Sequence, residues 1–191
     1  MKKRGLEKGE YGYREQHKKQ QLLLIFLGVL AILLQLGARR FTQQAAFQNI
    51  LTVMAIVSVL PVANLAAPFL ASFRYKTPGP DFYQALSPYE GQMAILYDLI
   101  ITSKELIMPM DGVVVHPLGT FFYCSDPKLS IQKAEAFLND FFCAQHLDPH
   151  AKVFTEEAAF FKRIASLKPS DGYEDDGSVA FTIRSLKNLS M

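Results

Sequence analysis

Residues 22–38 read LLLIFLGVLAILLQLGA and residues 50–73 read ILTVMAIVSVLPVANLAAPFLASF, and these two stretches decide the fold. Neither stretch contains Asp, Glu, Lys or Arg. Because an α-helix rises about 1.5 Å per residue, about 20 apolar residues cross the hydrocarbon core of a bilayer. The second stretch is long enough, whereas the first needs its flanking residues to complete the span. The sequence therefore predicts a transmembrane helical hairpin over residues 22–73, with the short loop 39–49 between its two helices.

The second apolar stretch carries Pro61, Asn64 and Pro68. A proline removes a backbone donor and blocks the preceding turn, so we expect a kink near Pro61. Asn64 is expected to hydrogen-bond across the hairpin to Gln35. These residues would suit a transport element or plain helix packing. Packing is favoured, because two helices enclose no pathway unless the protein forms a homo-oligomer.

The distribution of Lys and Arg sets the expected orientation of the hairpin. Residues 1–20 hold seven Lys and Arg against three Glu, whereas the loop holds only Arg39 and Arg40. Positive charge accumulates on the cytoplasmic flanks of membrane helices. We therefore predict a multi-pass protein of the cell membrane with both termini cytoplasmic, and a basic cytosolic segment over residues 1–21 that can touch anionic lipid. A cleaved signal peptide is not favoured, because the apolar run begins late and no small-residue cleavage site follows it.

Charge argues against nucleic acid as a partner of the remaining chain. Residues 74–191 carry 11 Lys and Arg against 15 Asp and Glu, a balance of −4. Nucleic-acid-binding domains normally carry a basic surface, because phosphate neutralisation supplies much of their affinity. The two cysteines suggest no disulfide framework. Cys143, His146 and His150 have a spacing that suits zinc, but a fourth ligand is not evident and a surface loop is the preferred interpretation.

Residues 74–87 contain Pro and Gly and are expected to link the hairpin to a cytosolic domain over residues 88–191. Ser87 followed by Pro and then Glu90 fits a capping box, in which the serine caps the helix and the glutamate reaches back to the cap amide. This pattern predicts a helix over residues 88–99.

The rest of the domain is expected to alternate between strands and helices. β-Branched apolar runs predict strands, and apolar residues at helical spacing predict helices capped by Ser130, Thr155 and Ser178. The expected strands are 99–108, 111–116, 120–124 and 152–154, and the first of these helices is expected over 131–143. The order α-β-β-β-α-β-α-α implies a small α/β domain with a mixed sheet flanked by helices.

The stretch from Ser87 to Leu167 resembles the nuclease-related domain family of the restriction-endonuclease-like superfamily. The resemblance lies in the order of elements: a helix with Glu90, a strand that opens with Asp111, a turn with Gly119, a second apolar strand, then a helix, a strand and a helix. It implies a restriction-endonuclease-like fold. In active members the second strand ends in Glu-x-Lys. There the aspartate and glutamate hold a divalent cation, for which Mg²⁺ is suited, and the lysine supports the attacking water.

The chain departs from that motif at two positions. Cys124 stands where the family has its glutamate, and Asp126 stands where it has its lysine, with Lys128 two residues further on. A thiol is a poor ligand for a hard cation. Each residue also has a structural interpretation: Glu90 as part of the capping box, Asp111 as the start of a strand, and Cys124 as a small buried side chain.

Three functions follow as hypotheses. The favoured one is a membrane-anchored, nuclease-related domain that is a pseudoenzyme without cofactor and acts in interaction or regulation. The alternative is a Mg²⁺-dependent nuclease or phosphodiesterase, with a rearranged catalytic site formed by Glu90, Asp111, Asp126 and Lys128. The third is a structural subunit, whose helices pack against a membrane protein partner. Convergence of the three carboxylates on one point would favour the enzyme.

Overall fold

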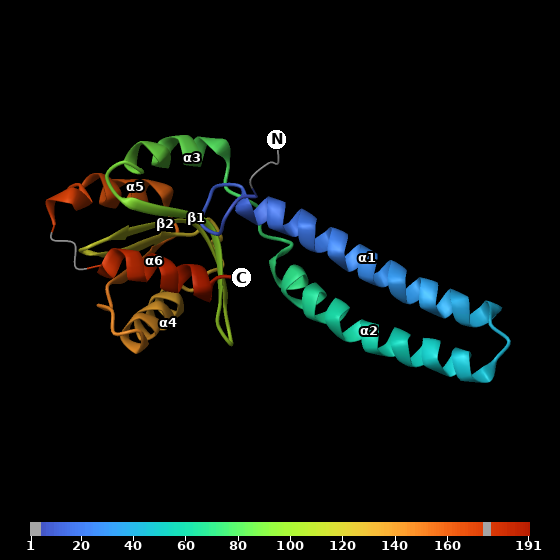
Figure 1. Ribbon diagram of the computed structural model, residues 1–191. Coiled ribbons are helices and arrows are strands. Elements are labelled where there is room, and N and C mark those ends of the chain that lie inside the picture. Colours follow the sequence, from blue (N-terminus) through green and yellow to red (C-terminus); the bar gives the residue numbers. More distant parts are fainter. Residues whose placement is uncertain (1–4, 174–176) are drawn as a thin grey trace. The chain divides into compact units, whose positions relative to one another are not determined.

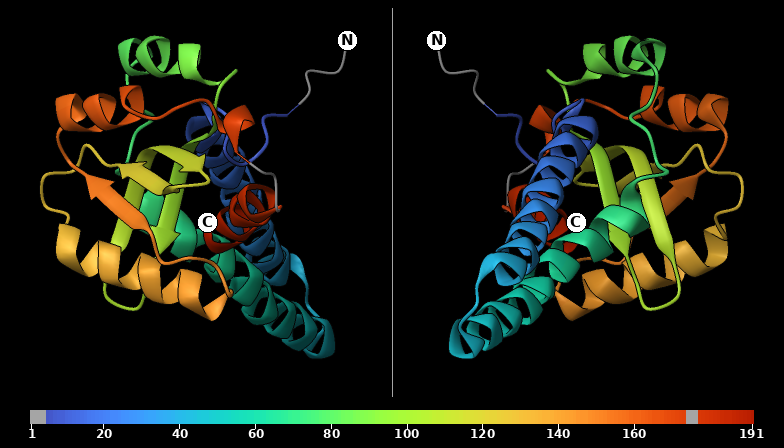
Figure 2. Two further views of the ribbon diagram at one scale, coloured as in Figure 1. Left: turned by 90° about the vertical axis from the view of Figure 1, so that its left-hand side faces the viewer. Right: turned by 90° about the vertical axis from the view of Figure 1, so that its right-hand side faces the viewer.

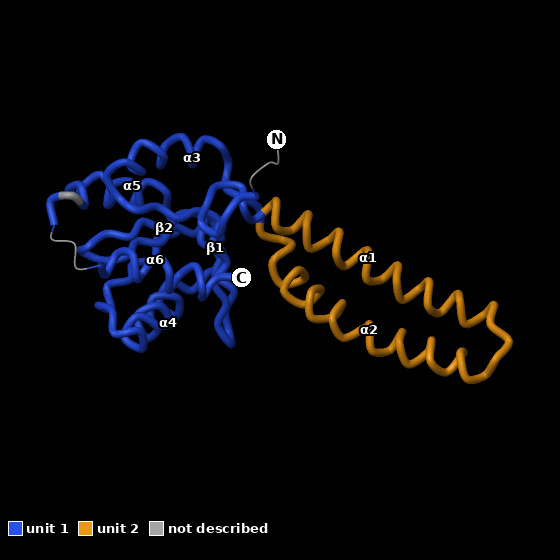
Figure 3. The backbone as a smooth tube through the Cα atoms, in the orientation of Figure 1, with its two compact units in different colours: residues 1–14, 76–191 blue, residues 15–75 orange. Residues whose placement is uncertain are grey.

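The computed structural model describes residues 5–173 and 177–191. Residues 1–4, which carry part of the predicted basic segment, lie outside the described residues. The chain divides into two compact units (Figure 3). One comprises residues 15–75 and the other comprises residues 1–14 together with 76–191.

The unit formed by residues 15–75 contains two long helices, α1 (Tyr13–Phe41) and α2 (Ala45–Ser72), joined by a short turn (Figure 1). Both are long and apolar enough to cross a membrane, and almost none of their most apolar residues are buried. α2 continues through Pro61 and Pro68, so neither residue ends the helix. The helices exceed the predicted stretches because the polar flanks are helical as well.

Helix packing in the hairpin differs from the prediction at one pair. Gln35 Nε2 donates to Ser58 Oγ at 3.4 Å, not to Asn64. Gly28 lies against Val62, so closely that an added Cβ would come within 2.4 Å of the valine Cγ2. This antiparallel register places Asn64 near the level of Gly28, about two helical turns from Gln35.

The other unit is built on a four-stranded mixed sheet with the order β1-β2-β3-β4. β1 (Ala94–Thr102), β2 (Ile107–His116) and β3 (Gly119–Tyr123) are successively antiparallel. β4 (Ala151–Phe154) pairs parallel to β3 after the crossover helix α4 (Ile131–Ala144). The predicted mixed sheet, the β2–β3 hairpin and the helix after Ser130 are confirmed.

Helices cover both faces of this sheet (Figure 2). α4 and α6 (Ser178–Leu189) pack on one face around the buried Phe122 and Leu138. α3 (Pro80–Leu86) and α5 (Glu157–Ala165) pack on the other, around Phe160. The short 3₁₀ turns η1 (Ser87–Tyr89) and η2 (Ser170–Gly172) complete the connections.

The predicted helix over residues 88–99 is wrong. A helix occurs earlier, as α3 within the expected linker, and β1 already begins at Ala94. β1 is buried on both faces, so its apolar residues do not alternate and their spacing imitates a helix. Ser87 is the C-cap of α3 and not the N-cap of a following helix, and its hydroxyl donates to Gln84 O at 3.4 Å. α5 begins after Glu156, one residue beyond the expected cap Thr155. α6 begins after Gly177, one residue before the expected cap Ser178.

Residues 5–14, here called the N-terminal arm, belong to the α/β unit. Tyr97 N donates to Gly9 O at 2.8 Å, which adds a bridge to the free edge of β1. Lys8 Nζ donates to Ser190 O at 2.7 Å, next to the end of α6. The Tyr11 ring stacks on Tyr83 of α3, with the ring centroids 4.5 Å apart. The arm therefore contacts elements on both sides of the sheet edge.

Candidate functional site

Two buried aspartates lie directly opposite each other on β1 and β2. The flanking pairs Tyr97–Gly112 and Leu99–Met110 place Asp98 across from Asp111. Asp98 has a φ of +59°, a left-handed conformation that non-glycine residues seldom adopt. Like charges directly opposite on neighbouring strands repel each other. A buried cation is therefore required at this point of the sheet if both side chains are ionised.

The alternation of side chains changes at the same point. On β1 the even-numbered Leu96 packs on the α4–α6 side, whereas after Asp98 the odd-numbered Leu99 and Ile101 pack on that side. The alternation of side chains therefore shifts by one residue at Asp98. On β2 the same side of the sheet receives Met110 and then Val113, three residues later. The alternation of side chains therefore shifts by one residue between them, at Asp111 and Gly112. Along a regular strand, every second side chain points to the same face of the sheet. The two aspartates thus mark a matched irregularity in both strands.

Arg14 of the N-terminal arm supplies the cation. Its Nη1 lies 3.1 Å from Asp111 Oδ1, and its Nε lies 3.7 Å from Asp98 Oδ1. Nη2 donates to Met110 O at 3.0 Å, and Nη1 also donates to Lys76 O. The three charged side chains are 0–3% exposed. We call these residues the Arg14–Asp98–Asp111 cluster. Its guanidinium joins the N-terminal arm to β1 and β2.

Further donors hold the two carboxylates. Asp98 Oδ2 accepts from Gly12 N at 2.8 Å and from Thr77 Oγ1 at 2.9 Å. Asp111 Oδ2 accepts from Ser125 N at 2.8 Å. Arg14 Nε and Asp98 Oδ1 are buried without a hydrogen-bond partner, and they face each other. Burial raises the pKa of Asp98, although Arg14 and these donors act in the opposite direction.

The four residues singled out in the sequence fall into three separate sets of hydrogen bonds. Asp111 is held by Arg14 and Ser125, and Glu90 accepts from the Tyr97 hydroxyl at 2.7 Å. Asp126 Oδ1 accepts from Lys128 N at 3.0 Å, in the exposed turn after β3. Among residues 5–173 and 177–191, no group of three or more His, Cys, Asp or Glu side chains is placed to hold a metal ion. The spacing of Cys143, His146 and His150 likewise produces no such group within the described chain.

Cys124 lies beside the cluster as a buried thiol. It is 0% exposed, and burial raises its pKa to about 11, although a hydrogen bond from the Asp126 backbone acts in the opposite direction. The Asp111 and Asp126 charges add to the rise and the Arg14 charge opposes it. Burial therefore disfavours the thiolate, which is the form that acts as a nucleophile or as a metal ligand. The interpretation of Cys124 as a small buried side chain agrees with this environment.

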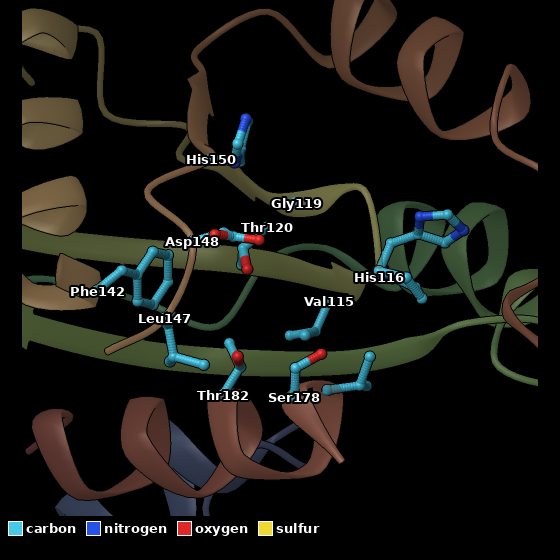
Figure 4. A pocket seen from close by; sticks show the side chains of 12 residues that line it. Val115, His116, Gly119, Thr120, Phe142, Leu147, Asp148, His150, Ser178 and Thr182 are labelled. Carbon is cyan, nitrogen blue, oxygen red and sulfur yellow. The ribbon is translucent and has the colours of Figure 1, made fainter. Parts of the chain in front are cut away.

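A cavity of about 110 Å³ lies at the other end of the strands, between β2, β3 and α6 (Figure 4). Ser178 and Thr182 rise from α6 toward the strands, with Thr120 opposite them. Val115, Phe142 and Leu147 form part of its apolar lining. The cavity therefore offers hydroxyl groups beside an apolar wall.

His116 forms the rim of this cavity and has two hydrogen bonds. Its Nδ1 accepts from Leu118 N at 3.1 Å, so Nε2 is the nitrogen that donates to Lys168 O, at 2.9 Å. Burial lowers the pKa of His116, and Arg163 lowers it further, while the bond to Lys168 opposes them. This neutral imidazole joins the β2–β3 turn to the segment after α5.

Sequence reasoning missed Arg14 and Asp98, which carry the cluster. Asp98 had a visible signal, since it is the one charged residue in the apolar run Ala94–Thr102. Arg14 had none, because it stands among six other Lys and Arg residues in the first 20 positions. Only the three-dimensional path of the arm distinguishes it from them.

Comparison of the chain with protein-family models, with curated proteins and with solved structures finds no match. The fold and the site alone therefore define its class. It is a protein with two helices of membrane-spanning length and apolarity, and a small mixed α/β domain closed by a buried Arg–Asp–Asp cluster.

Proposed function

We propose that this chain is a membrane-anchored protein whose α/β domain acts by binding, not by catalysis, at the cytosolic face of the membrane. The observation that carries the proposal is the pairing of Asp111 with Arg14. The one carboxylate that matches the nuclease-related motif is neutralised by a guanidinium 3.1 Å away and is 97% buried. A guanidinium in that position leaves no room for a divalent cation and repels one.

The fold relationship to restriction-endonuclease-like domains is part of this proposal. It is supported by the order β1, β2, β3, α4, β4, α5, with Asp111 on β2 and Gly119 at the start of β3. The helix with Glu90 that the resemblance implies does not form, because α3 ends at Leu86 and Glu90 follows the 3₁₀ turn η1. The positions where active members carry Glu-x-Lys hold Cys124 and Asp126. A domain that retains this fold but carries a neutralised aspartate is expected to lack the catalytic activity of active family members.

Membrane insertion is supported by the surface of the hairpin. Its helices expose a long series of large apolar side chains: Leu22, Leu23, Leu24, Phe26, Leu27, Leu33, Leu34, Val53, Ile56, Val57 and Leu60. Exposed apolar patches of this extent are stable only against lipid or another protein. At the end of the hairpin where both helices meet the domain sequence, Lys18 Nζ donates to the carbonyls of Phe73 and Tyr75. This basic end is the one assigned to the cytosol.

Insertion is tested by alkaline carbonate extraction of membranes from cells that express the chain. The chain should stay in the membrane pellet and require detergent for release. Protease added to sealed inverted vesicles should degrade the α/β domain, whereas right-side-out vesicles should protect it. Release by carbonate alone would refute the anchor, and the reverse protection pattern would refute the orientation.

Catalysis is tested on the full-length chain in detergent, incubated with DNA or RNA and Mg²⁺ or Mn²⁺. We expect no cleavage and no binding of Mn²⁺ above that of buffer. Cleavage that disappears in both Asp111→Asn and the half-buried variant Asp126→Ala would establish the nuclease alternative. The second variant is needed because Asp111 is buried and its replacement can unfold the domain.

A further inference from the structure

A second cavity lies within the hairpin unit, at the end where α1 and α2 are joined by the turn. Figure 1 shows this turn between the two helices. Its volume is about 430 Å³, and it is lined by Leu36, Arg39, Arg40 and Gln48. Both arginines come from the last turn of α1, and Gln48 comes from the first turn of α2. The cavity therefore combines two cations, one amide and an apolar side chain.

No acidic side chain of this unit can neutralise the two arginines. Residues 15–75 contain a single carboxylate, Glu15, which lies at the opposite end of α1. Within the described chain, neither Arg39 nor Arg40 forms a salt bridge or a side-chain hydrogen bond. One carbonyl at the end of α1 is already taken, since Thr42 Oγ1 donates to Ala38 O at 3.0 Å. The counter-anion must come from outside the unit.

We infer that this cavity binds the phosphate group of an anionic phospholipid. Guanidinium groups bind phosphate through paired N–H donors, and two adjacent ones can hold a single phosphodiester. Arg39 and Arg40 directly follow the apolar stretch that ends at Ala38, so an inserted hairpin places them at the height of the lipid headgroups.

Leu36 argues for a lipid and against a free phosphate ion. It lies one turn below Arg39 in the cavity wall and is 44% exposed, in a position to contact an acyl chain. Gln48 Nε2 donates to Thr42 O at 2.6 Å, which fixes the amide with its carbonyl oxygen available to a headgroup hydroxyl. A zwitterionic choline headgroup would bring a further cation to two arginines. An anionic headgroup with hydroxyls, such as that of phosphatidylglycerol, fits better.

The inference rests on the proposed membrane insertion and is tested with the full-length chain in nanodiscs of phosphatidylcholine that contain a minor fraction of phosphatidylglycerol. Native mass spectrometry then reports the lipids that remain bound after release. We expect phosphatidylglycerol to be enriched on the wild-type chain and its retention to fall roughly tenfold in Arg39→Gln/Arg40→Gln. The matched control Lys104→Gln/Lys162→Gln removes the same charge from exposed positions outside the hairpin and should keep the enrichment.

Three outcomes would overturn the inference. Equal enrichment in wild type and Arg39→Gln/Arg40→Gln, in chains that have entered the nanodisc, would refute the lipid site and leave the anchor intact. Displacement of the lipid by inorganic phosphate would assign the cavity to a free anion instead. A chain that stays outside the nanodisc would refute the anchor and this inference together. Intermediate retention in Arg39→Lys/Arg40→Lys, which keeps the charge and loses the paired donors, would support it.

Discussion

At the scale of single residues, Arg14 is the side chain on which the α/β unit depends most. Breaking a buried ion pair by removing one partner costs about 3–5 kcal/mol, because the remaining charge stays buried without compensation. Here the removal of one guanidinium would strand two carboxylates, each at most 3% exposed. The stability of small domains is only about 5–15 kcal/mol, so this cost is a large fraction of the total.

We therefore predict that Arg14→Met lowers the free energy of unfolding of the α/β unit by about 3–5 kcal/mol. The control is Lys133→Met, which breaks an ion pair with Glu105 whose side chains are 63% and 77% exposed. Exposed pairs contribute about 0–1 kcal/mol. Denaturant titration in detergent, followed by tyrosine near-ultraviolet circular dichroism, measures both. Equal losses of unfolding free energy in the two variants would contradict the conclusion that Arg14 stabilises the domain as the buried partner of both aspartates.

The pH dependence of stability should report on Asp98. Its folded pKa is raised from the ordinary value of 3.8, chiefly by burial. Just above that ordinary value the unfolded chain has lost the proton while the folded chain still holds it. The free energy of unfolding contributed by this group is therefore greatest in acid and falls as the pH rises through the raised pKa.

Asp98→Asn should remove this component, so that its stability falls less than that of the parent chain as the pH rises above 3.8. His116 has the opposite trend, because its lowered pKa makes stability fall as the pH decreases below 6.5. It contributes equally to both chains and cancels in the difference. Melting temperatures of parent and variant across this range measure the effect. Parallel curves would show that Asp98 has the same pKa in the folded and unfolded states.

At the scale of secondary-structure elements, sequence reasoning succeeded for α4, which has one exposed face. α4 alternates buried Ala134 and Leu138 with exposed positions, so its 3.6-residue period is visible and its predicted bounds agree to one residue. β1 failed for the converse reason, since burial on both faces removes the period of two. Of the three residues in the Arg14–Asp98–Asp111 cluster, only Asp111 was among the residues predicted for the site. Its partner Arg14 lies 97 positions away, and no local pattern specifies which cation approaches a given carboxylate.

Within the hairpin, Gly28 should be the position least tolerant of a side chain. A Cβ there would lie 2.4 Å from Val62 Cγ2, on a side chain that is stiff about its first torsion, whereas a Cβ at Gly37 meets nothing within 4 Å. Gly28→Ala should therefore push α1 and α2 apart, and Gly37→Ala should be neutral or stabilising by up to about 1 kcal/mol from helix propensity.

Crosslinking of Gln35→Cys to Ser58→Cys by a short thiol-reactive crosslinker measures the separation of the helices, because Gln35 Nε2 and Ser58 Oγ lie 3.4 Å apart. A crosslinker replaces a direct disulfide because a cysteine is shorter than a glutamine. The exposed Cys143 is replaced by Ser in this background, and the buried Cys124 is retained. Crosslinking in membranes should be slower with Gly28→Ala, unchanged with Gly37→Ala, and restored when Val62→Ala accompanies Gly28→Ala. Unchanged crosslinking with Gly28→Ala would refute the packing of Gly28 on Val62.

At the scale of the whole molecule, the α/β unit is discontinuous in sequence, and the hairpin is an insertion between its arm and its body. The arm ends at Arg14, and the body resumes at Lys76, whose carbonyl accepts a hydrogen bond from the Arg14 guanidinium. The two ends of the inserted segment are thus within the reach of one arginine side chain. A domain cut at residue 76 would lose the arm and leave both aspartates unpaired.

We predict that a chain in which residues 15–75 are replaced by a flexible Gly-Ser linker of about six residues folds as a soluble α/β domain. It should unfold cooperatively without detergent, because it keeps Arg14 on Asp111 and Tyr11 on Tyr83 while it loses the exposed apolar helices. Residues 76–191 alone should be less stable by at least the roughly 3–5 kcal/mol expected for the loss of the buried cation. A synthetic peptide of residues 5–14 added to residues 76–191 should restore part of that stability, and the same peptide with Arg14→Met should not. Equal stability of residues 76–191 with and without the arm would refute the integration of the arm into the domain, and would return residues 5–14 to the role of a plain basic flank.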